Sequence, residues 1–190
     1  MKLLVSVVDK SEAIESINGG AHIIDVKNPK EGSLGANFPR VIREIKEIIP
    51  KNIELSATIG DMPNLPGTAA LAALGAAVSG VKYVKIGLFG VKTIEDSTTM
   101  LAEVVRAAKE YDSRLRVIAS GYADYKTVGC INPLKLPSIA FNAGADGVLI
   151  DVKIKNGKSN LFNFLKYNDL RNFIIEAHSY NLLVAKSEGT

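Results

Sequence analysis

Short apolar runs alternate with helical segments along this chain, and this alternation limits the folds available to it. Seven runs have the length and composition of β-strands; they cover residues 2–8, 22–27, 53–60, 83–90, 115–122, 146–152 and 181–187. Six segments have helical spacing; they cover residues 11–17, 38–49, 68–78, 94–111, 133–143 and 169–180, the first with an expected capping box at Ser11. Strands and helices alternating at roughly thirty residues per unit predict a parallel sheet in a single α/β domain spanning residues 1–190.

The turn after the first strand distinguishes an open nucleotide-binding sheet from a barrel. A Rossmann-type sheet has a glycine-rich turn there, whereas this chain continues with DKSEAIES, which contains no glycine. Polar residues instead follow nearly every strand; they are Asp25, Lys27, Asp61, Lys85, Tyr122, Asp124, Asp151 and Lys155. Functional groups at the C-terminal ends of many strands are typical of a TIM barrel. We therefore predict a TIM (β/α)8-type barrel.

The length of the chain sets an expectation about how complete that barrel is. A TIM barrel usually has about 250 residues and eight strands, but this chain has 190 residues and seven candidate strands. We therefore expect a barrel that lacks the last helix–strand–helix segment at the C-terminus, as in a truncated form of a longer protein. A missing strand would leave an open sheet edge, which favours aggregation.

The composition is that of an ordinary globular protein, with 47% hydrophobic and 23% charged residues, and it excludes a disordered chain. The net charge is +3 and the basic residues are scattered, which favours small anionic ligands over nucleic acid.

The single cysteine, Cys130, excludes a disulfide framework and a Cys-rich metal site, so we expect a cytoplasmic protein. Residues 66–80 are apolar but shorter than the roughly 20 residues that cross a membrane, so no membrane segment is expected. The oligomeric state, homo-oligomer included, stays open.

Charged residues stand within or directly after apolar strands, where burial is costly unless the charges are paired or used. Residues two apart in a strand share a face, so charges in different strands can converge on one side of the sheet. On this basis we expect five side chains to meet at the C-terminal ends of the strands: Asp25, Lys27, Lys85, Asp151 and Lys155. One interpretation is an internal ion-pair network that fixes the register of the strands. Because apolar packing would stabilise the fold as well, the number of charges favours a functional site instead.

The residue types in this cluster predict imine chemistry. No grouping of His, Cys or Glu has metal-ligand spacing, and His22 and His178 read as solvated or core histidines. A lysine that lies near other cations and is shielded from water has a lowered pKa, so its neutral amine can attack a carbonyl carbon. Neighbouring carboxylates and a second lysine can transfer protons. We predict a Schiff-base enzyme whose substrate is a small carbonyl compound, phosphorylated because lysines are in excess.

The loop NPKEGSLGAN, residues 28–37, follows the second strand and contains Gly32 and Gly35. Backbone amides there could bind a phosphate, although a surface loop that needs glycine is the commoner explanation. Residues 57–67 and 119–129 read as similar loops. In the last of these, Tyr122 and Asp124 are candidates for supporting the site, contacting substrate or capping the next helix.

Four blocks of sequence resemble one enzyme family: HIIDVKNPKEGSLGANFP, SATIGDMPNLPGTAALAALGAAVSG, YVKIGLFG and ASGYAD. On these blocks the chain resembles the (5-formylfuran-3-yl)methyl phosphate synthases, also called 4-(hydroxymethyl)-2-furancarboxaldehyde-phosphate synthases. These are TIM-barrel enzymes of methanofuran biosynthesis in methanogenic archaea. The resemblance extends from the first residue to about Tyr180.

The resemblance implies a lyase without cofactor or metal that condenses two molecules of glyceraldehyde 3-phosphate into a furan aldehyde phosphate, releasing phosphate and water. It implies that Lys27 is the Schiff-base lysine and that Lys85 is an acid–base lysine. Asp25, Asp151 and Lys155 match the other charged positions of the family's active site. The resemblance therefore selects the same five residues as the strand alternation.

The chain departs from the family pattern near its C-terminal end. Lys153, in IDVKIKNGK, stands where the family more often has a Thr-Ala pair, and LLVAKSEGT replaces an Ala-Gly-Ser pattern. The family's later Gly-Val-Arg-Gly stretch, typical of a phosphate site, is missing. Two further functions stay open: a class I aldolase acting on another small sugar phosphate, and a truncated barrel without catalytic activity.

Overall fold

The computed structural model describes residues 1–155 and 160–186 of the chain. Its seven strands form one sheet in the order β1-β2-β3-β4-β5-β6-β7, and every pair is parallel. The strands are β1 (Leu4–Val7), β2 (Ile23–Val26), β3 (Glu54–Pro63), β4 (Tyr83–Gly90), β5 (Arg116–Tyr122), β6 (Gly147–Asp151) and β7 (Leu183–Lys186). Each strand therefore lies beside its neighbours in sequence, as in the predicted barrel.

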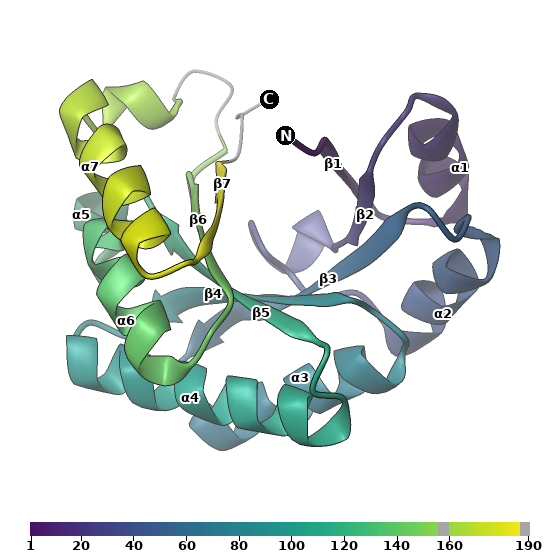
Figure 1. The fold of residues 1–190 in the computed structure, drawn as a ribbon, viewed down its shortest axis with the longest axis horizontal. Helices are drawn as coiled ribbons and strands as arrows, with labels where there is room; N and C mark the ends of the chain where they lie inside the picture. Colours follow the sequence, from purple (N-terminus) through teal and green to yellow (C-terminus); the bar gives the residue numbers. More distant parts are fainter. Residues whose placement is uncertain (156–159, 187–190) are drawn as a thin grey trace.

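Helices connect the strands and cover the outer face of the sheet. They are α1 (Lys10–Asn18), α2 (Pro39–Ile48), α3 (Pro66–Val78), α4 (Ile94–Tyr111), α5 (Tyr125–Val128), α6 (Leu136–Ala143) and α7 (Tyr167–Ser179), with short 3-10 helices η1 (Pro29–Glu31), η2 (Pro133–Lys135) and η3 (Leu161–Asn163). The sheet curls strongly, with β1 and β7 on opposite sides of its opening and the helices around its outside (Figure 1). The curled sheet confirms the predicted barrel-type α/β fold, in the form of a half-barrel. No helix in the described residues is long and apolar enough to cross a membrane.

The main core lies between the outer face of the sheet and the helices. Ile24, Val84 and Ile86 point to this side and are fully buried against apolar side chains of the helices, such as Ile45 and Leu101. Burial of each such side chain contributes about 1.5–3 kcal/mol. The core therefore uses one face of each strand, and the residues between these positions point to the inside of the curl.

Several boundaries of the predicted helices were wrong, and the helices predicted to begin at residues 68 and 169 begin at Pro66 and Tyr167. Helix α1 begins at Lys10, and its N-cap is Asp9, whose Oδ1 accepts a hydrogen bond from the amide of Glu12 at 3.0 Å. The expected capping box at Ser11 is therefore not formed, because Ser11 already lies inside the helix. The segment 133–143 is divided into η2 and α6, and the short helix α5 precedes it.

The expected loops at 57–67 and 119–129 are also corrected, since β3 continues as far as Pro63 and β5 as far as Tyr122. The pairing of β3 with β4 shifts after Thr58: Thr58 pairs with Lys85, but Asp61 pairs with Gly87. The extra residue on β3 is a β-bulge, and Gly60 has the positive φ of 119° within it. Because a bulge reverses the alternation of side chains, Asp61 shares a face with Thr58.

At the opposite, N-terminal end of the strands, Glu54 forms a separate charged cluster. Its carboxylate pairs with the ammonium of Lys2 at 2.6 Å and with Lys82, and it accepts a hydrogen bond from the hydroxyl of Tyr83 at 3.0 Å. Burial alone would raise the pKa of Glu54, but these hydrogen bonds lower it to about 2. The predicted functional charges lie at the other end of the strands.

Candidate active site

A buried ion pair between Asp25 and Lys85 lies at the centre of the inner face. Asp25 is 0% exposed and Lys85 is 4% exposed, and Lys85 Nζ lies 2.6 Å from Asp25 Oδ2. The hydroxyls of Ser6 and Ser56 also donate to the Asp25 carboxylate, at 3.1 and 2.7 Å. Both serines are register partners of Asp25 on the adjacent strands β1 and β3. The strand register therefore supplies two of the three donors to this buried carboxylate, and Lys85 of β4 supplies the third.

Lys27 lies two residues beyond Asp25 and is half-buried. Among the residues that the structure describes, none forms an ion pair or hydrogen bond with its ammonium group. Burial lowers the pKa of Lys27. The carboxylates of Asp25 and Asp151 oppose this shift, whereas the ammonium groups of Lys85 and Lys155 add to it. Lys27 therefore has a larger fraction of neutral amine than an exposed lysine at the same pH.

Asp151 is the last residue of β6 and is 3% exposed. Its Oδ1 accepts hydrogen bonds from the ammonium of Lys155 at 2.5 Å and from the amide of Val152 at 2.7 Å. Its Oδ2 accepts one from the hydroxyl of Ser33 at 3.0 Å. The side chain of Lys155 is 34% exposed. Asp151 and Lys155 thus connect the buried interior with the solvent.

The structure brings all five predicted side chains together. The charges of the other four act on the ammonium of Lys27, and two direct ion pairs join Asp25 to Lys85 and Asp151 to Lys155. We call these five residues the charged cluster. With three ammonium groups and two carboxylates it has a surplus of positive charge when all are ionised, which suits an anionic substrate.

A second network lies beside the charged cluster, at the C-terminal ends of β3, β5 and β6. Asp61 accepts hydrogen bonds from the hydroxyl of Tyr122 and from the ammonium of Lys153. The Lys153 ammonium also lies 4.8 Å from the centre of the Phe89 ring, a distance typical of a cation–π contact. Burial and the charge of Asp61 raise the pKa of Tyr122 well above its usual value. Lys153 therefore balances Asp61 and is not part of the charged cluster.

Asp124 has a supporting contact that sequence reasoning left open. Its two carboxylate oxygens accept hydrogen bonds from the amides of Lys153 and Ile154, at 2.9 and 3.0 Å. It stands at the N-cap position of α5 but makes no side-chain capping bond there. Asp124 therefore fixes the segment after β6, and the capping alternative is wrong.

The loop of residues 28–37 does not have the form of a phosphate cradle. Its backbone amides are largely used within the loop: Asn28 donates to the carbonyl of Gly35, Gly32 to that of Pro29, and Gly35 to that of Gly32. The amide of Leu34 points to Asp61, at 3.4 Å. The glycines allow close packing, since a Cβ on Gly35 would overlap the carbonyl oxygen of Asn28.

Four serines in this region were missed by sequence reasoning. Ser6 and Ser56 hold Asp25, Ser33 holds Asp151, and Ser120 lies fully buried on the inner face of β5. Among the described residues, the Ser120 hydroxyl has no hydrogen-bond partner. A serine within an apolar strand, as in LVSV and ELSA, is the signal that could have identified the pair around Asp25.

The histidines and the cysteine lie outside these contacts. His22 is exposed and accepts a hydrogen bond from the amide of Leu3 at 3.0 Å, and His178 is exposed on α7. Burial raises the pKa of Cys130 to about 11, so it is a thiol at neutral pH. The described part of the chain contains no group of three His, Cys, Asp or Glu side chains placed to hold a metal ion.

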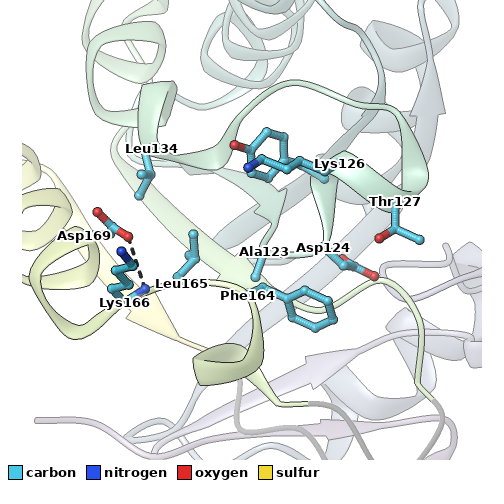
Figure 2. Close-up of a pocket in the computed structure, with 10 residues that line it drawn as sticks. Ala123, Asp124, Lys126, Thr127, Leu134, Phe164, Leu165, Lys166 and Asp169 are labelled. Atoms are coloured by element: carbon cyan, nitrogen blue, oxygen red, sulfur yellow. Dashed lines mark hydrogen bonds between the residues drawn. The ribbon is translucent and has the colours of Figure 1, made fainter.

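A hollow of about 240 Å³ lies between the β5–α5 segment and the start of α7 (Figure 2). Lys126, Phe164 and Lys166 are among the residues that line it. The amide of Lys166, at the start of α7, is already bound by the carboxylate of Asp169 at 3.1 Å. None of the five cluster residues lines the hollow, so it is separate from the candidate site.

Comparison with solved structures supports the barrel-type fold. The chain is similar to a dihydrodipicolinate synthase, with a TM-score of 0.69 and 13% identity over 98% of this chain and 64% of that chain. It is also similar to "QR15, an Aldolase", with a TM-score of 0.62 and 14% identity over 97% of this chain and 77% of that chain. At these identities the similarity shows the fold alone.

Sequence comparison identifies the family. The chain is 55% identical over 186 residues to a (5-formylfuran-3-yl)methyl phosphate synthase from Archaeoglobus fulgidus, covering 97% of this chain and 79% of the relative. It is 53% identical over 185 residues to the enzyme of the same name from Methanocaldococcus jannaschii, covering 97% and 78%. The family model described as 4-HFC-P synthase matches residues 3–186. The chain therefore belongs to the (5-formylfuran-3-yl)methyl phosphate synthase family.

Proposed function

We propose that this chain makes (5-formylfuran-3-yl)methyl phosphate, within methanofuran biosynthesis in the cytoplasm, from two molecules of glyceraldehyde 3-phosphate through an imine on Lys27. Its family membership supports the overall reaction. The observation that carries the mechanism is the state of Lys27, a half-buried lysine with a lowered pKa and no direct ion pair to a described residue. Of the three lysines in the charged cluster, the other two are each bound to a carboxylate.

In the first step, the neutral amine of Lys27 attacks the aldehyde carbon of one triose phosphate and forms a carbinolamine. Lys85 is bound to Asp25 as an ammonium, so it can donate a proton to the departing hydroxyl group, which leaves as water. The products are an iminium on Lys27 and a neutral amine on Lys85. Asp25 lies close enough to stabilise the positive charge that has moved to the iminium.

In the second step, Lys85 acts as a base. Its neutral amine removes a proton from the carbon next to the iminium, which gives an enamine and restores the ammonium that pairs with Asp25. The enamine carbon attacks the aldehyde of the second triose phosphate and forms the new carbon–carbon bond. This order explains how a lysine that rests as an ion-paired ammonium can serve first as acid and then as base.

Loss of phosphate, ring closure and dehydration complete the furan. The overall balance is two triose phosphates giving one furan aldehyde phosphate, one phosphate and two molecules of water. Lys155 is the most exposed member of the charged cluster, and it is paired with the buried Asp151. We assign them to proton transfer during these eliminations and to holding the anionic substrate.

Borohydride reduction in the presence of glyceraldehyde 3-phosphate tests this proposal. Reduction converts an imine into a stable secondary amine, which peptide mass spectrometry can locate. We expect an adduct on Lys27 and, in unreduced samples, a product with furan absorbance. The variant Lys27→Met should lose both, whereas Lys126→Met, on the edge of the separate hollow, should keep both.

The outcomes also distinguish the other functions that the sequence leaves open. An adduct on Lys27 with a non-furan sugar phosphate product would indicate an aldolase. A folded protein that gives neither adduct nor product would contradict the proposal and support a barrel without catalytic activity. An adduct on Lys85 in place of Lys27 would contradict the assignment of roles.

A further inference from the structure

The loop of residues 28–37, which we call the crossing loop, joins β2 to α2 and reaches across to β3 and β6. Its C-terminal end is fixed by hydrogen bonds to residues outside the loop. The hydroxyl of Thr58 donates to the carbonyl of Gly35 at 2.7 Å, and the side-chain amide of Asn37 donates to the carbonyls of Val8 and Lys27 at 2.9 and 3.1 Å. Together with the bonds within the loop, these contacts give it one defined path over the inside of the curl.

The middle of the crossing loop is fixed by a separate hydrophobic contact. Leu34 is 2% exposed and packs against Tyr122 and Cys130 in a small cluster apart from the main core. Gly32 lies so close to Asp61 that a Cβ there would overlap its carboxylate. The loop therefore does not depend on the Ser33 hydroxyl to stay in place.

The Ser33 hydroxyl is directed at the charged cluster. Ser33 is 8% exposed, and its Oγ lies 3.0 Å from Asp151 Oδ2 and 3.3 Å from the carbonyl oxygen of Val152. A hydroxyl has a single proton to donate, and the charged carboxylate oxygen is the nearer and stronger acceptor. The hydrogen bond connects residues that lie 118 positions apart in the sequence.

The two oxygens of Asp151 thus have different partners. Oδ1 accepts from Lys155 and from the amide of Val152, and Oδ2 accepts from Ser33. Donors on both sides of a carboxylate fix its rotation about the bond to Cβ. Without the Ser33 hydroxyl, Oδ2 loses this buried donor, and the carboxylate is held less firmly in the orientation in which Oδ1 meets Lys155.

We propose that Ser33 is a positioning residue of the active site: its hydroxyl holds the Asp151 carboxylate in the orientation that pairs with Lys155 beside Lys27. This inference rests on the proposed function, because it assumes that Asp151 and Lys155 act during the reaction. Ser33 itself does not need to touch the substrate. The crossing loop, in place of binding phosphate, then serves to orient a carboxylate on the far side of the sheet.

The kinetic test uses three variants. Ser33→Ala removes the hydroxyl, Ser33→Thr keeps one, and Ser79→Ala removes a buried serine hydroxyl that donates to Gly75 within α3, far from the charged cluster. We expect Ser33→Ala to lower kcat roughly ten- to a hundredfold, the effect of losing one hydrogen bond to a charged group, with little change in KM. Ser33→Thr should recover most of this loss, and Ser79→Ala should match the wild type.

A second measurement is independent of catalysis. The amide of Val152 donates to Asp151, whereas the amide of Lys153 donates to Asp124. Hydrogen exchange followed by NMR should therefore show faster exchange of the Val152 amide in Ser33→Ala and not in Ser33→Thr. The Lys153 amide should exchange at the same rate in all variants and serves as the internal control.

The two measurements separate this inference from the proposed function. A wild-type protein that makes no furan product contradicts the proposed function, and the Val152 amide still shows whether Ser33 orients Asp151. Unchanged Val152 exchange in Ser33→Ala would overturn the inference even in a fully active enzyme. A Ser33→Thr variant that behaves like Ser33→Ala in both measurements would also overturn it, since the hydroxyl would then not be the cause.

Discussion

The ion pair between Asp25 and Lys85 offers a quantitative test of the structure through the substitution Lys85→Met. Methionine has nearly the same length and fills the same space but carries no charge. In the wild type, Asp25 accepts three hydrogen bonds, and the ammonium of Lys85 is the only cationic donor among them. Among the described residues, the variant therefore leaves a fully buried carboxylate with two hydrogen-bond donors, the serine hydroxyls on β1 and β3.

The expected loss of stability follows from the burial of the pair. Removing one partner of a buried ion pair costs about 3–5 kcal/mol, because the other charge remains without compensation. For a chain of this size, that loss corresponds to a decrease in Tm of roughly 6–20 °C. Adding Asp25→Asn to Lys85→Met removes the uncompensated charge and should recover part of the loss. The double variant should therefore be more stable than Lys85→Met alone.

Urea denaturation at neutral pH, followed by circular dichroism, measures these differences. The control is Arg106→Met, which breaks the exposed pair of Arg106 with Glu103 at 3.3 Å and should cost less than about 1 kcal/mol. If Lys85→Met also costs less than about 1 kcal/mol, the pair is solvated in solution and the buried cluster described above is incorrect. A double variant less stable than Lys85→Met would contradict the role of the uncompensated charge.

Three further predictions concern stability. Gly87→Ala should lower the free energy of unfolding by about 1–3 kcal/mol, because the new Cβ would overlap the Tyr122 hydroxyl. Gly75→Ala, which has open space around it in α3, should raise the free energy of unfolding by about 0.5–1 kcal/mol. Thermal melts of the two variants and the wild type measure both changes. The pKa of Glu54 is about 2 in the folded chain, below its ordinary value of 4.5, so the stability that Glu54 contributes is present above pH 4.5 and is lost as the pH falls toward 2. Glu54→Gln should therefore show a flatter decline of stability in acid titrations than the wild type. Ser120→Ala should keep or raise the free energy of unfolding, since the hydroxyl has no partner among the described residues, and a loss above about 1 kcal/mol in urea would contradict this.

The alternation of side chains made the centre of the site predictable from sequence. Asp25 and Lys85 lie on regular strands, so their shared face followed from the period of two, and the structure places them in direct contact. The same rule identified Asp151, the last residue of β6, whereas Lys155 lies four residues beyond the end of that strand and still pairs with Asp151. The parallel order of the strands was predictable for a similar reason, because each helical segment is long enough to return the chain to the same edge.

The supporting contacts were not predictable, because they depend on departures from regular geometry. The bulge at Gly60 turns Asp61 to the inner face, and strict alternation from Thr58 would have pointed it outward. Strict alternation beyond β6 would place Lys153 on the same face as Asp151, but the segment after β6 is not a strand and Lys153 reaches Asp61. The contact of Ser33 with Asp151 joins distant parts of the chain, and a single sequence has no local signal for it.

The nearest-neighbour order of the strands has a consequence for how the molecule assembles. Each strand pairs with the next one along the chain, so the sheet can grow one unit at a time with short loop closures. The contacts of Ser33 with Asp151 and of Asp61 with Lys153 instead span 118 and 92 residues, and they require the sheet to be in place from β2 to β6 and from β3 to β6, respectively. The reactive centre is therefore a late product of folding, and partially folded chains hold an ordered sheet before they hold a complete set of catalytic groups.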